Sequence, residues 1–516
     1  MLTPDGHAAY KLEKVMLLSL WAKALRDENN TIKDSQTKEM IFAGLGKPTF
    51  PINAKTIASY LSYWHRLDDL SKKWQENPEL ESSAIDYGDP RGDIMPRTIM
   101  AKVMTRWYQS EIQSEDILFT IGGIGALRII FETFNSHFED IPGYRIITPF
   151  PYYSVYSNNP SHRLHPIHVM AEPGYKVTAK ALEESIKEAY ILAESDHGLP
   201  KALLLCNPSN PLGNIIDASE IKKIGDVLAN YPDLYIIFDE AYAEMSFVEM
   251  PSFLKICPHL KERTIILRSA TKALSAAGER MAIIIVFDRY LMSEMLNKNI
   301  NYFIHAPRSA QMAYAETMEH FDEHDRQQLV TFYKYKVEYV VQRLLAMGAS
   351  MPDTEYHVEA TFYALGDFSE LLGLQLPEKV EAILQKKGKV TTGEDLAYYL
   401  MINDHLMIAP LSYFGLSACC GFMRITCSGT HDELNELMNR LEFRLIQARK
   451  EKRTHLFHYL QEKIPLIKEK DPILYQEMIS ILDSLSQNEE CLELKKQNNK
   501  LMKIKALIVS FLEYNQ

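Results

Sequence analysis

Short apolar runs alternate with longer amphipathic stretches through the middle of the chain. Six of these runs predict buried strands, at residues 117–120, 145–148, 202–206, 234–238, 264–267 and 282–286. The segments between most of them have helical spacing, as in Ala218 to Asn230. This alternation is typical of an α/β domain with a largely parallel sheet, which binds ligands at the carboxyl ends of its strands. The residues just after each run are therefore the first candidates for chemistry.

The pattern changes from about residue 325. A long helical stretch, Asp325 to Met347, is followed by shorter strand-like runs at 361–365, 406–409 and 422–427, which predicts a second, α+β domain. After about residue 450 the spacing is helical, and the last amphipathic segment is Leu492 to Leu512. We expect a helical extension that packs on its own domain, with a partner-binding helix as the weaker alternative.

Composition limits the class of protein. The chain has 516 residues, 46% of them apolar, and its 56 Lys and Arg against 68 Asp and Glu give a net charge of −12. These values argue against a disordered or fibrous chain and against non-specific nucleic-acid binding. The N-terminal apolar run, Val15 to Ala22, is too short to span a bilayer and is not followed by a small-residue cleavage site, so an amphipathic surface helix is expected.

The six cysteines form no CxxC pair and have no zinc-ligand spacing. We expect reduced thiols and no metal site. Together with the composition, this predicts a soluble, cytoplasmic protein without a membrane or nucleic-acid partner.

A lysine lies just beyond the apolar run 264–267, in the segment Arg268 to Arg280. Lys272 could form a Schiff base with a carbonyl cofactor if its neighbours lower its pKa. Ser269 and Arg280 lie on either side, and a hydroxyl with a guanidinium could hold a phosphate.

Two further segments follow apolar runs. A carboxylate at Asp239 would keep a cationic ring nitrogen protonated, and Tyr242 could donate to a ring phenolate oxygen. Taken by itself, Asp239 is more simply a cap of the next segment. The segment Asn207 to Gly213 has two prolines and a glycine that impose an extended turn, from which Asn210 could donate to the same ring oxygen.

A glycine-rich turn, Thr120 to Leu127, runs into the helix predicted at 127–134. The backbone N–H groups of Gly123, Ile124 and Gly125 could hold a phosphate at the start of that helix. The turn is neither a GxGxxG fingerprint with a downstream acid nor a Walker loop. A nucleotide-binding transferase is therefore the weakest interpretation.

The motifs Asn-Pro-x-Asn-Pro-x-Gly, Asp-x-x-Tyr and Ser-x-x-Lys-x7-Arg occur in this order. Together they resemble fold-type I pyridoxal-phosphate enzymes, specifically class I/II aminotransferases related to aspartate aminotransferase, over about residues 40–445. The resemblance implies that Lys272 forms the Schiff base with pyridoxal 5′-phosphate and that Asp239 pairs with its ring nitrogen. It also implies that Asn210 and Tyr242 bond the ring hydroxyl, while the phosphate contacts come from Ser269, Arg280 and the 123–125 turn, where Ile124 replaces the usual hydroxyl residue.

The same resemblance assigns further residues. Tyr153 would stack on the cofactor ring, and Tyr87 would contact the phosphate bound by the partner subunit. Gly46 would lie, with Asn210, beside the substrate, and Arg424 would clamp its α-carboxylate. Each of these residues taken singly is more simply structural. Arg308 lies near subunit-crossing positions of the family, and a surface ion pair is favoured over a substrate contact.

The resemblance implies a three-layer large domain with a mainly parallel seven-stranded sheet, a smaller α+β domain and a C-terminal helical extension. The expected divisions are an N-terminal segment that joins the small domain (1–75), the cofactor-binding large domain (76–325), the small domain (326–448) and the extension (449–516). A homodimer with shared active sites is implied as well.

The implied activity is amino transfer between an L-amino acid and a 2-oxo acid by a ping-pong mechanism, with Lys272 as the base. A lyase or β-decarboxylase using the same site is the nearest alternative, since it needs only another fate of the substrate carbanion. A non-catalytic binding protein of this fold is a further alternative, against which the intact Lys272, Asp239 and Arg424 argue. The sequence does not specify which amino acid is accepted.

Overall fold

The computed structural model describes residues 1–8, 12–32, 38–79, 85–136, 144–158, 162–468, 470–485 and 488–514. Seven strands from this part of the chain form the main sheet, in the order β2-β8-β7-β6-β5-β3-β4. All pairs from β7 to β4 are parallel, whereas β8 is antiparallel to both of its neighbours. The strands are β2 (Ile117–Ile121), β3 (Tyr144–Pro149), β4 (His162–Ile167), β5 (Pro200–Cys206), β6 (Tyr235–Asp239), β7 (Thr264–Ser269) and β8 (Met281–Val286). The mainly parallel seven-stranded sheet expected from the sequence is confirmed.

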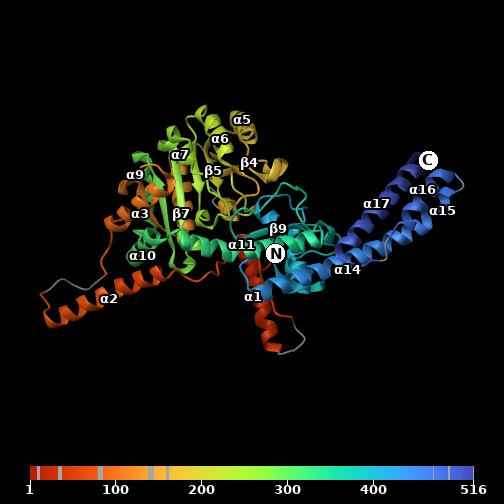
Figure 1. Ribbon diagram of the computed structural model, residues 1–516, viewed down its shortest axis with the longest axis horizontal. Helices are drawn as coiled ribbons and strands as arrows, with labels where there is room; N and C mark the ends of the chain where they lie inside the picture. Colours follow the sequence, from red (N-terminus) through yellow and green to blue (C-terminus); the bar gives the residue numbers. More distant parts are fainter. Residues whose placement is uncertain are drawn as a thin grey trace.

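Helices cover both faces of this sheet, which makes three layers (Figure 1). Along β5, Ala202 and Leu204 pack into one core, whereas Leu203 and Leu205 pack into the other. Because both faces are covered, the strand is apolar at successive positions. One face carries α4 (Gly122–Ser136) and α9 (Arg289–Phe303), and the other carries α3 (Ile94–Tyr108), α5 (Ala179–Asp196), α6 (Ala218–Ala229), α7 (Phe253–Ile256) and α10 (Arg308–His320).

The small domain is built on an antiparallel sheet with the order β11-β12-β9. The run 406–409, expected as one strand, is divided between two sheets: β10 pairs with β1 near the N-terminus, while β11 pairs with β12. The elements are β1 (Ile41–Phe42), β9 (Tyr363–Asp367), β10 (Leu406–Met407), β11 (Ala409–Pro410), β12 (Phe422–Thr426), α1 (Lys14–Ile32), α11 (Glu323–Ala346), α12 (Glu378–Leu384) and α13 (Gly393–Asn403).

Helix α2 (Ala54–Glu76) does not follow the expectation that all of residues 1–75 join the small domain. It packs against α10, a helix of the large domain, and extends away from the body of the molecule (Figure 1). The contact includes a buried hydrogen bond of 2.8 Å between the Thr56 and Thr317 hydroxyls. This hydrogen bond contributes to the packing of α2 on the large domain.

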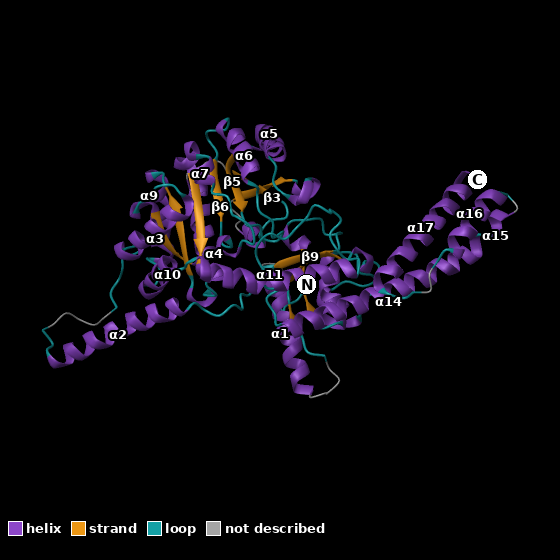
Figure 2. Cartoon of the chain, viewed as in Figure 1, coloured by secondary structure: helices purple, strands orange, loops and turns teal. Residues whose placement is uncertain are grey.

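The C-terminal extension is a helical arm (Figure 2). Helix α14 (His431–Lys463) runs without a break through the boundary expected at residue 448, and α17 (Cys491–Tyr514) packs along it. The shorter α15 (Pro465–Lys468) and α16 (Pro472–Asp483) complete a separate apolar core around Leu460 and Ile504. Arg449, 1% exposed, joins the arm to the small domain because its guanidinium bonds Glu370 and the Met347 carbonyl.

Among the described helices, none combines the length and the apolar composition needed to cross a membrane.

Candidate active site

The candidate residues come together at the carboxyl ends of three adjacent parallel strands. Asp239 is the last residue of β6, and its register partners are Cys206 at the end of β5 and Leu267 on β7. The turn that begins at Asn207 follows β5, and the helix α8 (Ala270–Ala273), which contains Lys272, follows β7. Parallel pairing therefore places residues about 30 apart in sequence next to one another, at the edge where α/β sheets bind ligands.

Lys272 is enclosed by other parts of the site. Its Nζ donates to the Gly46 carbonyl oxygen at 2.6 Å. Burial lowers the pKa of Lys272 to about 8, and the positive charges of Arg424 and Arg280 act in the same direction, while Asp239 opposes them. A substantial fraction of this amine is neutral near physiological pH, so it is suited to attack a carbonyl carbon.

The Asp239 side chain is 4% exposed. Its Oδ2 accepts a 2.7 Å hydrogen bond from the Tyr156 hydroxyl, and its Oδ1 accepts one of 3.3 Å from the Ala241 N–H. Burial raises its pKa, and these two hydrogen bonds partly offset the rise. No basic side chain in the described part of the chain forms an ion pair with Asp239. A buried carboxylate of this kind fits a protonated ring nitrogen as its partner.

Arg424, Asn210 and Tyr242 form a chain of hydrogen bonds. Arg424 Nη1 donates to Asn210 Oδ1 at 2.8 Å, and Asn210 Nδ2 donates to the Tyr242 hydroxyl at 3.4 Å. The second Nη of Arg424 donates to the Gly44 carbonyl, but its Nε is buried and has no partner among the described residues. This unpartnered donor fits a carboxylate, which guanidinium groups bind strongly.

The glycine-rich segment forms the first turn of α4, which begins at Gly122 instead of at residue 127. Gly122 has a φ of +66°, and a Cβ there would lie 2.5 Å from Nη2 of Arg280. A Cβ on Gly123 would lie 3.9 Å from Oγ of Ser269. The free N–H groups of a first helical turn, a guanidinium and a hydroxyl thus meet at one place, which suits a phosphate. Ile124 can add only its backbone N–H.

These groups fit pyridoxal 5′-phosphate. The cofactor has an aldehyde for Lys272, a ring nitrogen for Asp239 and a ring oxygen for the hydroxyl and amide donors at Tyr242 and Asn210. Its phosphate matches the first turn of α4.

Three other predicted residues have different surroundings. The Tyr153 ring packs edge-on against Tyr156 with centroids 5.6 Å apart, next to Asp239. The Tyr87 side chain is 75% exposed and contacts the edge of His305, so within one chain it does not join the cluster around Lys272. Arg308 forms a partly exposed ion pair with Asp93, with Nε and Oδ2 2.7 Å apart, the surface pairing favoured above.

Sequence reasoning missed two aromatic residues of the site. Tyr156 ends the segment already singled out for Tyr153, and its hydroxyl donates to Asp239. The Tyr363 hydroxyl lies 2.8 Å from that of Tyr242, and its ring centroid lies 4.2 Å from Cζ of Arg424. No local pattern links Tyr363 to residues so distant in sequence.

A network of buried polar side chains lies next to the carboxyl ends of β6 and β7. Arg268, which precedes Ser269, donates from Nη1 to the Tyr108 hydroxyl at 2.9 Å and from Nη2 to Glu244. Tyr108 in turn donates to Glu240, the residue after Asp239, at 2.5 Å. Burial raises the pKa of Glu240 to about 7. The network ties β6 and β7 to α3, and the sequence contained no pattern that indicated it.

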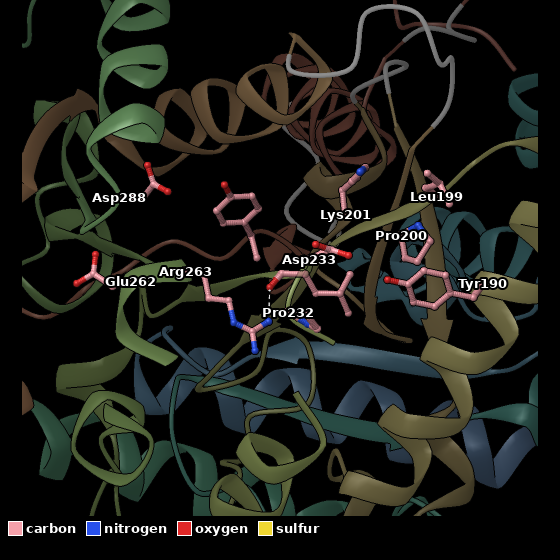
Figure 3. Close-up of a pocket in the computed structure, with 11 residues that line it drawn as sticks. Tyr190, Leu199, Pro200, Lys201, Pro232, Asp233, Glu262, Arg263 and Asp288 are labelled. Atoms are coloured by element: carbon pink, nitrogen blue, oxygen red, sulfur yellow. Dashed lines mark hydrogen bonds between the residues drawn. The ribbon is translucent and has the colours of Figure 1, made fainter. Parts of the chain in front are cut away.

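A separate cavity of about 560 Å³ opens at the opposite ends of the strands, beside Lys201 and Asp233 (Figure 3). The Arg263 guanidinium there donates to the backbone carbonyls of Tyr231 and Leu234. Its charge is therefore used to hold the loop, and the cavity contains none of the candidate residues.

Comparison with known proteins agrees with this geometry. The family model described as aminotransferase class I and II matches residues 60–441. A putative aminotransferase of Bacillus subtilis (YugH) is 25% identical over 70% of this chain and 84% of its own length. A probable aspartate/prephenate aminotransferase of Rickettsia felis is 24% identical over 64% of this chain and 75% of its own length.

A solved structure of similar fold is the aspartate aminotransferase from Rhizobium meliloti. It has a TM-score of 0.66 and 20% identity, and the match covers 84% of this chain and 97% of that structure. The family match spans most of the chain and includes every strand of the main sheet. The chain therefore belongs to the class I and II aminotransferases, which are transferases that depend on pyridoxal 5′-phosphate.

Proposed function

We propose that the protein transfers an amino group between an L-amino acid and a 2-oxo acid by a ping-pong mechanism, with Lys272 as the catalytic lysine. The observation that carries the proposal is the pKa of Lys272, lowered to about 8 by burial, next to the buried carboxylate of Asp239. An amine of this pKa can both attack a carbonyl and accept or return a proton near neutral pH.

The other residues have complementary roles. When bound, the cofactor supplies an electron-accepting ring for the substrate's Cα–H bond. Asp239 keeps the negative charge next to the ring nitrogen, and Asn210 and Tyr242 donate to the ring oxygen. Arg424 binds the α-carboxylate and Gly46 borders the same space, so one end of the substrate is held while Lys272 moves the proton. Ser269, Arg280 and the amides of residues 123–125 hold the phosphate, and Tyr153 packs on the ring.

We propose a homodimer in which Tyr87 reaches the phosphate of the partner's site. The Tyr87 ring supports this, because it is 75% exposed and is therefore accessible to a partner subunit. Along α2, Ile57, Leu61 and Trp64 form an apolar stripe and are 46%, 54% and 52% exposed. Exposed apolar stripes are a feature of interfaces between subunits.

A cytoplasmic location is part of the proposal. It rests on the six cysteines, all of which are free thiols, as is usual in reducing compartments.

The test is an absorption spectrum of the purified protein before and after addition of single amino acids, with Lys272→Ala as control. Aspartate comes first, because relatives are named aspartate/prephenate aminotransferases. We expect the band of the Lys272-bound cofactor to give way to that of its amino form while a 2-oxo acid accumulates. Release of carbon dioxide or ammonia would instead support the lyase or decarboxylase alternative. No cofactor band at all would support a binding protein without turnover.

A further inference from the structure

The Tyr363 side chain lies between residues from three other segments of the site. It extends from β9 and is 1% exposed. Its hydroxyl is 2.8 Å from that of Tyr242, and its ring centroid is 4.2 Å from Cζ of Arg424. A Cβ at Gly46 would overlap the Tyr363 hydroxyl, so this approach requires glycine there. Tyr363 thus contacts Tyr242, which is proposed to bind the cofactor, and Arg424, which is proposed to bind the substrate. It also contacts the loop at Gly46, whose carbonyl oxygen accepts a hydrogen bond from Lys272.

The hydroxyl contact bears on where the Tyr242 proton points. The Tyr242 oxygen already accepts from Asn210, and a phenol has one proton to donate. Among the described residues, Tyr242 is the only side chain hydrogen-bonded to the Tyr363 hydroxyl. If Tyr363 donates to Tyr242, the Tyr242 proton remains for the ring oxygen of the cofactor, and the added hydrogen bond polarises that donor.

The ring contact bears on Arg424. The guanidinium is 3% exposed, and its Cζ lies 4.2 Å from the Tyr363 ring centroid and 4.5 Å from that of Phe414. No carboxylate of the described chain pairs with it. Aromatic faces attract a cation without using its N–H donors. The rings therefore hold the guanidinium in place while its Nε stays available.

We propose that Tyr363 is a positioning residue for the proposed reaction, an inference that rests on the proposed function. Its hydroxyl orients the Tyr242 proton toward the cofactor, and its ring orients Arg424 toward the substrate carboxylate. These two roles use different parts of the side chain, so substitutions can separate them.

The experiment compares Tyr363→Phe with Tyr363→Leu in the cofactor-loaded protein. The first readout is the pH titration of the bound cofactor's absorbance without substrate, and the second is the KM of the amino donor. Phenylalanine removes only the hydroxyl, so the titration midpoint should rise by about half a pH unit, since the ring oxygen loses part of its donor. KM should stay within about twofold. Leucine also removes the ring, so KM should rise by roughly fivefold to tenfold as well.

Two further variants make the result specific. In a Tyr242→Phe background, Tyr363→Phe should cause no further shift of the midpoint, because its effect passes through Tyr242. Tyr398→Phe is the matched control, since Tyr398 is also fully buried but its hydroxyl contacts Met1 Sδ, and neither readout should change.

The inference is overturned if Tyr363→Phe leaves the midpoint unchanged, or shifts it equally with and without the Tyr242 hydroxyl. An unchanged KM in Tyr363→Leu overturns the role of the ring. Failure of the proposed function looks different, because the parent protein would then show no titrating band that depends on Lys272.

Discussion

Arg424 on β12 donates a 2.8 Å hydrogen bond to the side-chain oxygen of Asn210, which lies 214 residues earlier in the turn after β5. This bond joins the small domain to the large domain at the point where the substrate carboxylate would bind. It also leaves the amide N–H₂ of Asn210 directed at Tyr242. Substrate and cofactor contacts are thereby linked through one amide group.

Arg424→Lys should raise the KM of the amino donor by about tenfold to a hundredfold with a smaller effect on kcat. An ammonium lacks the planar pair of donors with which a guanidinium binds a carboxylate. Steady-state kinetics with an amino acid and its 2-oxo acid would measure the change. A loss of similar size in kcat with an unchanged KM would contradict the role assigned to Arg424.

Capture of added cofactor by the apoprotein should accelerate with pH and reach half of its maximal rate near pH 8. Only neutral Lys272 is nucleophilic, and its pKa is lowered from 10.5 to about 8, so the reactive fraction grows as pH rises through that value. Stopped-flow absorbance at a series of pH values measures the rate. Lys272→Ala should show no covalent capture at any pH, and a half-maximal rate near pH 10 would contradict the burial argument.

Asp239→Asn should reduce the rate of amino transfer by about a hundredfold or more, because an amide cannot keep a ring nitrogen positively charged. Tyr156→Phe should have a smaller effect, about tenfold, since it removes one of the two hydrogen bonds to the carboxylate but retains the charge. Single-turnover kinetics of both variants would test this order. The reverse order would show that Asp239 acts only as a structural acceptor.

Arg268→Met should lower the free energy of unfolding by about 3–5 kcal/mol, because it leaves the buried carboxylates of Glu240 and Glu244 without their cation. Denaturant unfolding of the purified protein measures the loss. Arg268→Lys, which preserves the charge, should lose less.

The stability should also depend on Glu240. Its pKa is raised in the folded protein, from 4.5 to about 7, so between these values the folded state binds more protons than the unfolded state. Its contribution to stability is therefore complete below pH 4.5 and declines as pH rises through 7. Glu240→Gln should remove this part of the pH dependence. Denaturant unfolding at several pH values between about 5 and 8 measures the free energy of unfolding, and the same pH dependence in the variant and the parent protein would contradict the prediction.

Tyr87→Phe should weaken retention of the cofactor while folding and the dimer remain intact, if its hydroxyl contacts the phosphate in the partner's site. The loss should be severalfold to about tenfold in Kd, as for one hydrogen bond to a charged group. Equilibrium dialysis of the cofactor, with sedimentation to monitor the dimer, provides the measurement. Unchanged retention would remove Tyr87 from the site.

The pattern of apolar residues predicted most of the central sheet because parallel strands that are covered on both faces must be apolar throughout. The reasoning did not predict β4, since it is an edge strand that contains polar residues such as exposed Arg163 and buried His165. The run 406–409 is predicted as one strand because two adjacent two-residue strands have the same apolar composition as one longer strand, although they belong to different sheets. The start of α4 was placed late because glycine is a poor helix former, although its first turn here is made of glycines.

The sequence by itself determined the family, through motifs whose residues lie close together along the chain: Lys272 with Arg280, Asp239 with Tyr242, and the turn around Asn210. Spacing of this kind is preserved by local geometry, so it can be recognised without coordinates. Only the tertiary structure decided which groups meet across domains, such as Tyr363 with Tyr242 and Lys272 with the Gly46 carbonyl. These contacts depend on how the small domain and the N-terminal segment pack over the sheet, and packing is a property of the whole chain that no short pattern encodes.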